Sequence, residues 1–444
     1  MQDIENNERS GDKGGGAREA VLGRGIEDGH GVPCPYEGGE VMSATAPARE
    51  VAGGRIPELD GLRGLAILLV LCSHYIGTAD RTSVRPLLRH FLGVFDAGWM
   101  GVDLFFVLSG FLIGGILLDA RGSPSYFRTF YMRRVFRILP VYYLWTLIYG
   151  LIVLGAMVFL RGQTGLGAVD LKQVPIQLLF LRDVFIGAMG PLALAWFMAT
   201  WSLAVEEQFY LLAPPLIRFV STRKLVVTLA AVIAVLPALR WMLIHTWGIT
   251  GLRVAYFSMP FRADALAWGI LLAAGWRWAA FREFLQRRKG LLQSVTVILL
   301  AGVCALLPWF ARPFGMVSIA VGLSWLGMFF SALVLLVLSQ TEGWVAGLMR
   351  WHVLRSLGTV SYCVYVIHTA VIIYTHKLVL GASPQIYNLQ GVAVTLLALG
   401  LTLGVAALSW RYYEKPLIRR GHRYSYEGTE SVEGGARVLE SLKV

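Results

Sequence analysis

The sequence has few charged residues, which make up only 15% of its 444 positions. Soluble globular domains carry about 25% charged residues, so this composition argues against a soluble protein. Hydrophobic residues account for 56% of the chain. Apolar runs of roughly 20 residues, the length that crosses a bilayer as a helix, recur along most of it. The sequence therefore predicts an all-α, polytopic membrane protein.

Cysteine is also scarce, with four residues in the whole chain. Three of them lie in apolar runs, and the spacing matches neither a disulfide framework nor a zinc site. We therefore expect no metal centre. The first residues lack the apolar core of a cleavable signal peptide. The net charge of +12 requires no nucleic-acid partner, because basic loops on the cytoplasmic side of a membrane protein produce such an excess.

We expect about ten spanning helices and two polar tails. The apolar segment 175–184 is weaker and is expected to form a re-entrant or interfacial helix. Residues 55–418 form the predicted transmembrane domain, and the tails at 1–54 and 419–444 are predicted to be disordered. Met42 would make an ordinary start, in which case residues 1–41 would be a mis-assigned extension. The expected spans lie near residues 60–79, 97–118, 138–160, 200–220, 225–244, 262–279, 291–310, 317–338, 357–379 and 391–410.

Basic residues in the connections indicate the orientation in the membrane. Arg and Lys gather after the second, fourth, sixth and eighth spans and in the C-terminal tail, whereas the opposite connections are poorer in them. Since cytoplasmic loops are enriched in Lys and Arg, both termini are predicted to be cytoplasmic. The expected location is the cytoplasmic (inner) cell membrane.

The first span carries two ionisable residues, Arg63 and His74. They are eleven residues apart, which is three helical turns plus roughly 20°, so both lie on one face about 16 Å apart along the axis. Ionisable groups inside a membrane normally face the bundle interior or a water-filled cavity. A neutral imidazole can accept a proton, so His74 is a candidate general base. The alternative is a buried histidine hydrogen-bonded between helices.

Other spans place charged or ionisable groups at a similar predicted depth, between mid-membrane and the outer boundary. We therefore expect one central polar chamber. Glu206 is predicted to orient the His74 imidazole or stabilise its cation, as the carboxylate of a catalytic triad does. Its alternative is a polar clamp with Arg or Tyr. Asp103 is a further catalytic candidate, with a helix-packing contact as its alternative. The groups at this depth are His74, Asp103, Glu206, Glu207, Arg262, Asp264 and His368.

Three arginines, Arg133, Arg134 and Arg137, begin the third span on its predicted cytoplasmic side. Guanidinium groups suit polyphosphate recognition, and Arg63 lies at the same level. We expect these four residues to bind a cytoplasmic donor with a pyrophosphate head. The alternative for such a segment is a topology signal that contacts lipid headgroups.

Small and aromatic residues suggest structural roles. Gly61 and Gly64 are predicted to permit close helix approach. The tyrosines of the segments YCVYVIH (Tyr362 and Tyr365) and RYYEKPL (Tyr412 and Tyr413) are interpreted as anchors at the membrane interface.

Seven motifs in this order resemble the acyltransferase-3 family, integral membrane enzymes that O-acylate sugars of cell-surface polysaccharides and related glycans. The resemblance covers about residues 56–418 and implies ten core spans. It implies that His74 is the catalytic base with Arg63 as its motif partner, and that Glu206 is the motif carboxylate. It places Arg134 and Arg137 at the acyl-donor side. The motifs are ELDGLRGLAILLVLCSHY, GVDLFFVLSGFLI, RRVFRILPVYY, TWSLAVEEQFYL, FRADALAWG, SLGTVSYCVYVIHTAVI and YYEKPL.

The expected function is transfer of an acyl group, acetyl in most of this family, from cytoplasmic acyl-CoA to a hydroxyl of a surface glycan or lipid-linked sugar. The expected partners are this carbohydrate or glycolipid acceptor and the membrane lipids. The alternative is a transporter that uses the buried charges as an ion or proton relay. It would predict inverted repeats, which the sequence does not show. A non-catalytic scaffold is disfavoured by the intact pair of Arg63 and His74.

Overall fold

The computed structural model describes residues 56–77, 92–159, 173–189, 195–310 and 315–426. All of them belong to the unit formed by residues 51–444. The N-terminal segment that the sequence predicts to be disordered lies outside the described residues. Within those residues every regular element is a helix. The predicted all-α architecture is therefore confirmed.

Each predicted span corresponds to a helix. Eight helical segments of the described chain are long and apolar enough to cross a membrane. The remaining two predicted spans are α8, which carries two glutamates and two prolines, and α10, which has only 15 residues. The expected bundle of about ten spanning helices is consistent with this count. The ten helices are α1 (Pro57–Cys72), α3 (Gly101–Asp119), α4 (Tyr126–Phe159), α8 (Trp201–Phe219), α9 (Thr222–Phe257), α10 (Ala263–Arg277), α12 (Lys289–Phe310), α13 (Leu323–Ser339), α15 (His352–Leu380) and α16 (Leu389–Ser409).

Shorter elements complete the unit. The weak apolar segment near residues 175–184 is split between two short helices, α6 and α7, which meet at Phe180 with a positive φ of 52°. Single π-helical turns extend α1 and α16 and precede α13. The short elements are η1 (Ser73–Gly77), η2 (Val94–Met100), α6 (Gln173–Leu178), α7 (Arg182–Met189), η3 (Ala195–Thr200), η4 (Met259–Arg262), α11 (Ala279–Arg287), η5 (Ser318–Gly322), α14 (Trp344–Met349), η6 (Trp410–Glu414) and α17 (Lys415–Gly421).

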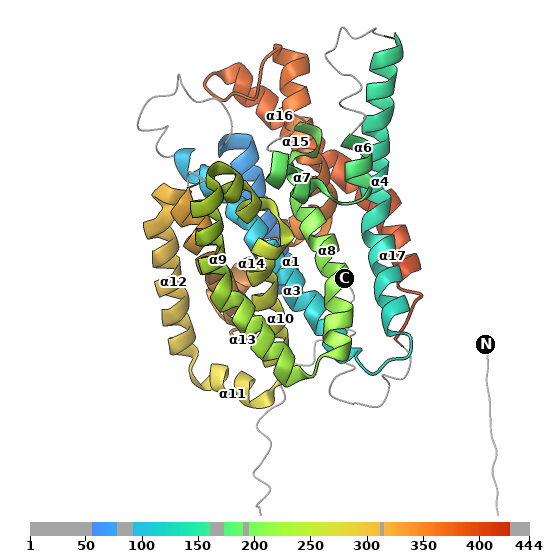
Figure 1. The fold of residues 1–444 in the computed structure, drawn as a ribbon. Helices are drawn as coiled ribbons and strands as arrows, with labels where there is room; N and C mark the ends of the chain where they lie inside the picture. The colour runs from blue at the N-terminus through green and yellow to red at the C-terminus, as the bar shows by residue number, and fades with distance from the viewer. Residues whose placement is uncertain (1–55, 78–91, 160–172, 190–194, 311–314, 427–444) are drawn as a thin grey trace, which may run out of the picture. The chain divides into compact units, whose positions relative to one another are not determined.

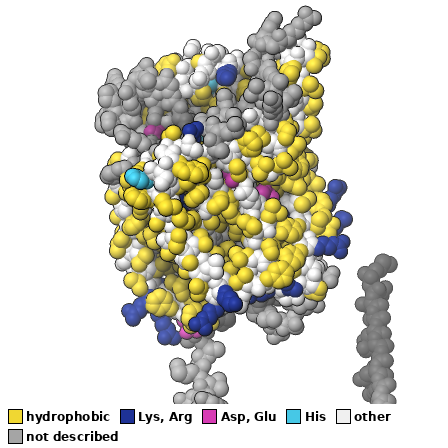
Figure 2. Space-filling view, in the orientation of Figure 1, with side chains coloured by type: hydrophobic (Ala, Val, Ile, Leu, Met, Phe, Trp, Pro, Cys, Tyr) yellow, Lys and Arg dark blue, Asp and Glu magenta, His cyan; other side chains and the backbone are white. Residues whose placement is uncertain are grey.

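Basic connections gather at one end of the helix bundle. The turns from α3 to α4 and from α8 to α9, together with α11, all lie at the lower end in Figure 1. Figure 2 shows Lys and Arg side chains along this lower edge, below a side surface covered mainly by hydrophobic side chains. We call it the basic end. Its connections carry Arg121, Arg218, Arg223, Lys224, Arg282, Arg287, Arg288 and Lys289. Such clustering is what the positive-inside rule expects of the cytoplasmic side of a membrane protein. The cytoplasmic location of the termini stays a prediction.

Helix α1 packs against α15 and α14 with backbone touching backbone. A Cβ atom added at Gly61 or Gly64 would lie 1.8 Å from the carbonyl oxygen of Met349 or Leu354. A Cβ added at Gly358 would lie 1.9 Å from the carbonyl oxygen of Asp60. The predicted role of Gly61 and Gly64 in close helix approach is therefore confirmed. Because Arg63 lies between these two glycines, the contact also fixes the rotation of α1 and the direction of the Arg63 side chain.

We expect the Gly64→Ala variant to be less stable than the wild type. The added methyl group would overlap the α15 backbone, and overpacking of this kind costs about 1–3 kcal/mol. Gly404→Ala in α16 is the matched control, because no heavy atom lies within 4 Å of its added Cβ. The melting temperature of the detergent-solubilised protein measures both. Equal melting temperatures for the two variants would contradict a tight contact between α1 and α15.

Candidate active site

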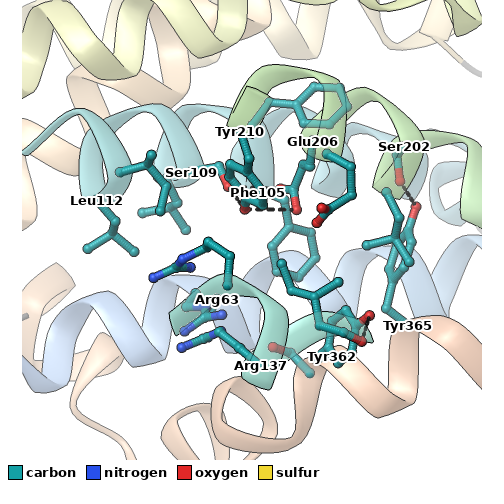
Figure 3. A pocket seen from close by; sticks show the side chains of 18 of the residues that line it. Arg63, Phe105, Ser109, Leu112, Arg137, Ser202, Glu206, Tyr210, Tyr362 and Tyr365 are labelled. Atoms are coloured by element: carbon teal, nitrogen blue, oxygen red, sulfur yellow. Dashed lines mark hydrogen bonds between the residues drawn. The ribbon is translucent and has the colours of Figure 1, made fainter. Parts of the chain in front are cut away.

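A pocket opens between α1, α3, α4, α8 and α15 (Figure 3). Its empty space, including the mouth, is about 940 Å³. We call it the main pocket. Part of the lining from α3 is apolar and includes Phe105, Leu108 and Leu112, and the other helices supply polar groups. The expectation of one polar chamber is thus met only in part, because Glu206 and Glu207 line this pocket and the other groups expected at this depth do not. The polar side chains that line it are Arg63, Ser109, Arg134, Arg137, Ser202, Glu206, Glu207, Tyr210, Ser361, Tyr362 and Tyr365.

Three guanidinium groups meet in the main pocket. Arg134 and Arg137 are three residues apart and share one face of α4, and Arg63 joins them from α1. In the described part of the chain, neither Arg63 nor Arg134 has a hydrogen-bond or ion-pair partner, and Nε of Arg134 is buried. Like charges in a partly buried site repel one another more strongly than in water. A bound anion would relieve this repulsion, and guanidinium forks match phosphate geometry.

Glu206 and Glu207 bring negative charge into the same pocket from α8. Ser109 Oγ donates to Oε1 of Glu206 at 2.9 Å, and the Tyr210 hydroxyl donates to Oε2 at 3.3 Å (Figure 3). These contacts match the polar clamp that was the alternative for Glu206. No contact with His74 accompanies them among the described residues, so the orienting role of Glu206 toward the imidazole stays a prediction.

His74 follows α1 in the π-helical turn η1. Its Nδ1 lies 3.0 Å from the carbonyl oxygen of Val70. Because a carbonyl can only accept, we infer that Nδ1 carries the proton and that Nε2 carries the lone pair. This is the tautomer in which Nε2 can act as a base. A backbone carbonyl one turn earlier in the chain thus helps to orient the imidazole.

His368 is a second histidine of this region that the predicted site did not include. Its ring centroid lies 4.9 Å from that of His74, with the rings at 75°. It is fully buried, and its Nδ1 lies 2.8 Å from the carbonyl oxygen of Tyr365, which assigns the same tautomer. Its Nε2 has no hydrogen-bond partner among the described residues. The two imidazoles thus form a pair with matching proton positions.

The histidine pair lies beside the main pocket, and His74 is not part of the lining. The ring of Tyr365, which does line the pocket, lies 5.6 Å from the ring of His368. The hydroxyls of Tyr365 and Ser202 are 2.5 Å apart, and Figure 3 shows them away from Arg63 and Arg137. Tyr365 therefore connects the pocket to the histidines.

The interpretation of Tyr362 and Tyr365 as interfacial anchors is wrong. Both side chains line the main pocket, and Tyr365 is buried. The sequence did contain a signal, because Tyr362, Tyr365 and His368 recur every third residue and so lie on one side of a helix. That spacing distinguishes a pocket-facing stripe from anchors at a membrane boundary.

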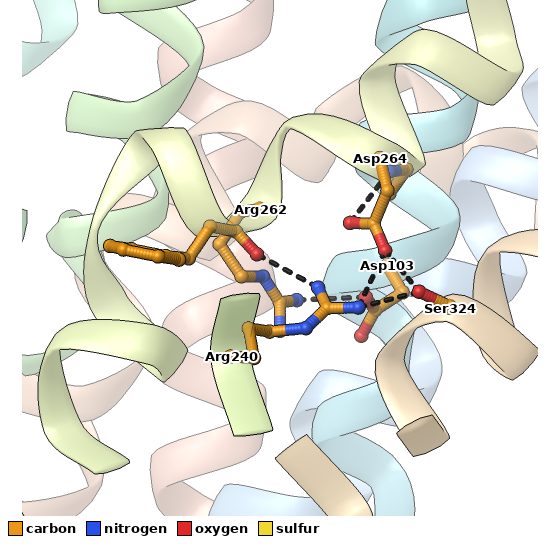
Figure 4. Close-up of polar contacts among 7 residues, drawn as sticks. Asp103, Arg240, Arg262, Asp264 and Ser324 are labelled. Carbon is orange, nitrogen blue, oxygen red and sulfur yellow. Dashed lines mark hydrogen bonds and ion pairs between the residues drawn. The ribbon is translucent and has the colours of Figure 1, made fainter. Parts of the chain in front are cut away.

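Asp103 lies in a different polar cluster (Figure 4). Arg262 Nη2 is 2.8 Å from Asp103 Oδ1, and Arg240 Nη2 is 2.8 Å from Asp264 Oδ2, with all four side chains buried. Ser324 Oγ also donates to Asp264 at 2.6 Å. The cluster joins α3, α9, α10 and α13, and none of its members lines the main pocket. This geometry matches the helix-packing alternative for Asp103, whose catalytic role stays a prediction.

Arg133 points away from the main pocket, toward the C-terminal segment. Its Nε donates to the carbonyl oxygen of Tyr424 at 2.8 Å. Helix α17 continues to Gly421, and residues as far as Tyr426 contact α4. Residues 419–426, which the sequence assigned to a disordered tail, therefore belong to the packed unit. The rest of that tail lies outside the described residues.

Comparison with known proteins agrees with this architecture. An acyltransferase-domain family model, that of the acyltransferase-3 family, matches residues 56–411. The chain is 25% identical over 399 residues to a peptidoglycan O-acetyltransferase of Listeria monocytogenes, covering 84% of this chain and 57% of that protein. It is 29% identical over 392 residues to a Bacillus subtilis protein provisionally named as a peptidoglycan O-acetyltransferase, covering 83% and 56%. A Staphylococcus aureus protein provisionally named as an O-acetyltransferase is 25% identical over 402 residues, covering 82% and 58%.

The chain thus spans rather more than half the length of these curated relatives. No solved structure gives a significant match. The family match covers most of the sequence and all of the helices that build the main pocket. The chain belongs to the acyltransferase-3 family.

Proposed function

We propose that the chain transfers an acyl group, acetyl by likeness to its relatives, from acyl-CoA to a hydroxyl of a cell-surface glycan or lipid-linked sugar. The observation that carries this proposal is the convergence of Arg63, Arg134 and Arg137 in one partly buried pocket. Guanidinium groups gathered in one pocket suit a polyphosphate ligand, because their planar forks match the geometry of phosphate oxygens. Two of the relatives are named as peptidoglycan O-acetyltransferases, so a peptidoglycan sugar is one candidate acceptor.

The donor is proposed to lie along the main pocket. Its phosphates would bind the guanidinium groups, and its arm would pass the apolar side chains of α3 toward Tyr365. Glu206 lies within electrostatic range of Arg63 and Arg134, so we assign it the positioning of these guanidiniums. The thioester would then lie at the end of the pocket nearest the histidine pair.

The hydroxyls of Ser202 and Tyr365 would stabilise the negative charge that develops on the carbonyl oxygen. At 2.5 Å they share one hydrogen bond, in which only one hydroxyl donates. The other hydroxyl proton is then left for the carbonyl oxygen. Preorganised donors aimed at a developing oxyanion are among the strongest contributions to catalysis.

His74 would act as the general base. Its Nε2 would take the proton of the acceptor hydroxyl while the acceptor oxygen attacks the thioester carbon. The carbon–sulfur bond then breaks, and the departing thiolate takes the proton from the imidazolium. His368, whose ring centroid lies 4.9 Å from that of His74, would stabilise the transient cation electrostatically through its Nε2 lone pair. In a variant mechanism, Nε2 of His74 would carry the acyl group between two displacements.

The direction of transfer follows from the predicted topology. With the basic end in the cytoplasm, the coenzyme would enter from the cell interior, and His74 would lie in the outer half of the membrane. The acceptor would then approach from outside or laterally as a lipid-linked sugar. The two substrates would meet near Tyr365.

Replacing the base should abolish transfer without unfolding the protein. We expect His74→Gln to lower turnover at least about 100-fold, the usual range for loss of a general base. The measurement is the O-acetyl content of surface glycans, or label transferred from acetyl-CoA, in cells that carry each variant. His245→Gln is the control, because this exposed histidine lies outside the pocket. Substantial turnover by His74→Gln would refute the base assignment.

Removing guanidinium groups should weaken donor binding. We expect the double variant Arg134→Gln with Arg137→Gln to raise the dissociation constant for coenzyme A at least about tenfold, since charge-assisted bonds to phosphate are lost. Isothermal titration with the purified protein measures this constant. Arg411→Gln, an exposed residue outside the pocket, controls for the loss of positive charge. An unchanged constant in the double variant would count against phosphate binding by α4.

The Tyr365 hydroxyl should affect kcat more than donor affinity. We expect Tyr365→Phe to reduce kcat about 10- to 100-fold while the coenzyme A dissociation constant changes little, because an oxyanion donor acts mainly in the transition state. Tyr143→Phe, whose hydroxyl bonds to the carbonyl of Leu178, is the control. A full kcat for Tyr365→Phe would exclude the proposed oxyanion role.

A further inference from the structure

A second, smaller pocket adjoins the main pocket at the C-terminal segment. Arg134 and Arg137 line both pockets, and the second adds Arg133, His422 and Tyr426. We call it the C-terminal pocket. None of the described residues that line it is acidic. Its polar lining therefore consists of three guanidiniums, an imidazole and a phenol.

Hydrogen bonds hold the C-terminal segment 422–426 against α4. The hydroxyls of Ser125 and Thr129 both donate to the carbonyl oxygen of Ser425, at 3.0 and 2.9 Å. Arg133 donates to the carbonyl of Tyr424 on the same segment. The absence of a side chain at Gly421 permits the approach, because a Cβ there would lie 3.0 Å from the Cβ of Phe136. The wall that this segment makes is thus a built part of the fold.

The chemistry of the C-terminal pocket suits a phosphorylated aromatic ligand. Arg133 lies 5.2 Å from the centre of the Tyr426 ring, and Phe130 adds a second ring to the lining. Burial raises the pKa of the Tyr426 phenol to about 12, against the opposing effect of Arg133, so it stays neutral at physiological pH. Guanidinium groups form bidentate hydrogen bonds with phosphate, and aromatic rings can stack with a nucleobase.

We propose that the C-terminal pocket binds the phosphorylated nucleotide head of the thioester donor, while the donor's arm occupies the main pocket. The proposal rests on the proposed function and deepens it. It divides the arginines by role: Arg133 contacts only the head, whereas Arg134 and Arg137 lie where head and arm join. It also makes the segment 422–426 part of the donor site. An anionic lipid headgroup offers the same phosphate chemistry, and the test separates the two ligands.

The test compares two ligands on the full-length protein in nanodiscs of neutral phosphatidylcholine. Coenzyme A carries the phosphorylated head, and pantetheine is the arm without it. We expect Arg133→Gln and Tyr426→Leu to weaken coenzyme A binding about tenfold each and to change pantetheine binding less than about twofold. Arg423→Gln is the control, because it removes the same charge from an exposed neighbour of His422 outside the pocket. Arg133→Gln also removes a hydrogen bond to the backbone of the C-terminal segment, so this variant could fail to fold there. Tyr426→Leu leaves the hydrogen bonds to the segment's backbone in place and therefore tests the pocket independently of that bond.

The outcomes distinguish the two proposals. If the wild type binds coenzyme A and both variants bind it equally well, the C-terminal pocket is not the head site, and the donor proposal stands. Equal losses for coenzyme A and pantetheine would also overturn the head assignment. If the C-terminal pocket instead binds a lipid headgroup, Arg133→Gln will lose co-purified anionic lipid in native mass spectrometry and keep its affinity for coenzyme A. That result would overturn the inference. If the wild type does not bind coenzyme A at all, the proposed function fails as well.

Discussion

A charged group in the hydrocarbon layer raises the free energy of the protein unless a partner, a ligand or water compensates it. This chain meets that constraint in two ways. Asp103, Arg262, Arg240 and Asp264 compensate one another in a buried cluster that joins four helices. The arginines of the main pocket instead share a cavity with Glu206 and Glu207. The first group joins helices within the fold, whereas the second lines a cavity.

Much of the architecture was predictable because bilayer thickness fixes the length of an apolar helix. All ten predicted spans coincide with helices, including α8, whose glutamates lower its apolarity. The pocket arginines and Glu206 were also predicted, since a costly residue in a span requires a polar environment. The sequence could not predict which charged side chains contact one another. The depth of a residue in the membrane does not determine which residue of another helix lies beside it. Asp103 and Glu206 lie at similar predicted depths but in separate clusters.

Other features depend on contacts that no local pattern specifies. The π-helical turn at Ser73–Gly77 does not follow from the apolar pattern, yet it contains His74. The hydrogen bond between this histidine and the Val70 carbonyl does not follow from the sequence pattern either. The C-terminal segment is polar and short, so composition alone indicates disorder. Its order comes from bonds to Arg133, Ser125 and Thr129, which are about 300 residues away in sequence.

The glycine contact between α1 and α15 has a mechanical result. The segments α1–η1 and α15 carry Arg63, His74, Tyr365 and His368, and their close backbone approach couples the positions of these side chains. Arg134 and Arg137 lie on α4, which contacts α15 through a hydrogen bond from the Tyr362 hydroxyl to the carbonyl oxygen of Ile138. Substitutions at the glycine contact would therefore displace groups on both α1 and α15 together, even though Gly64 itself lies outside the pocket lining.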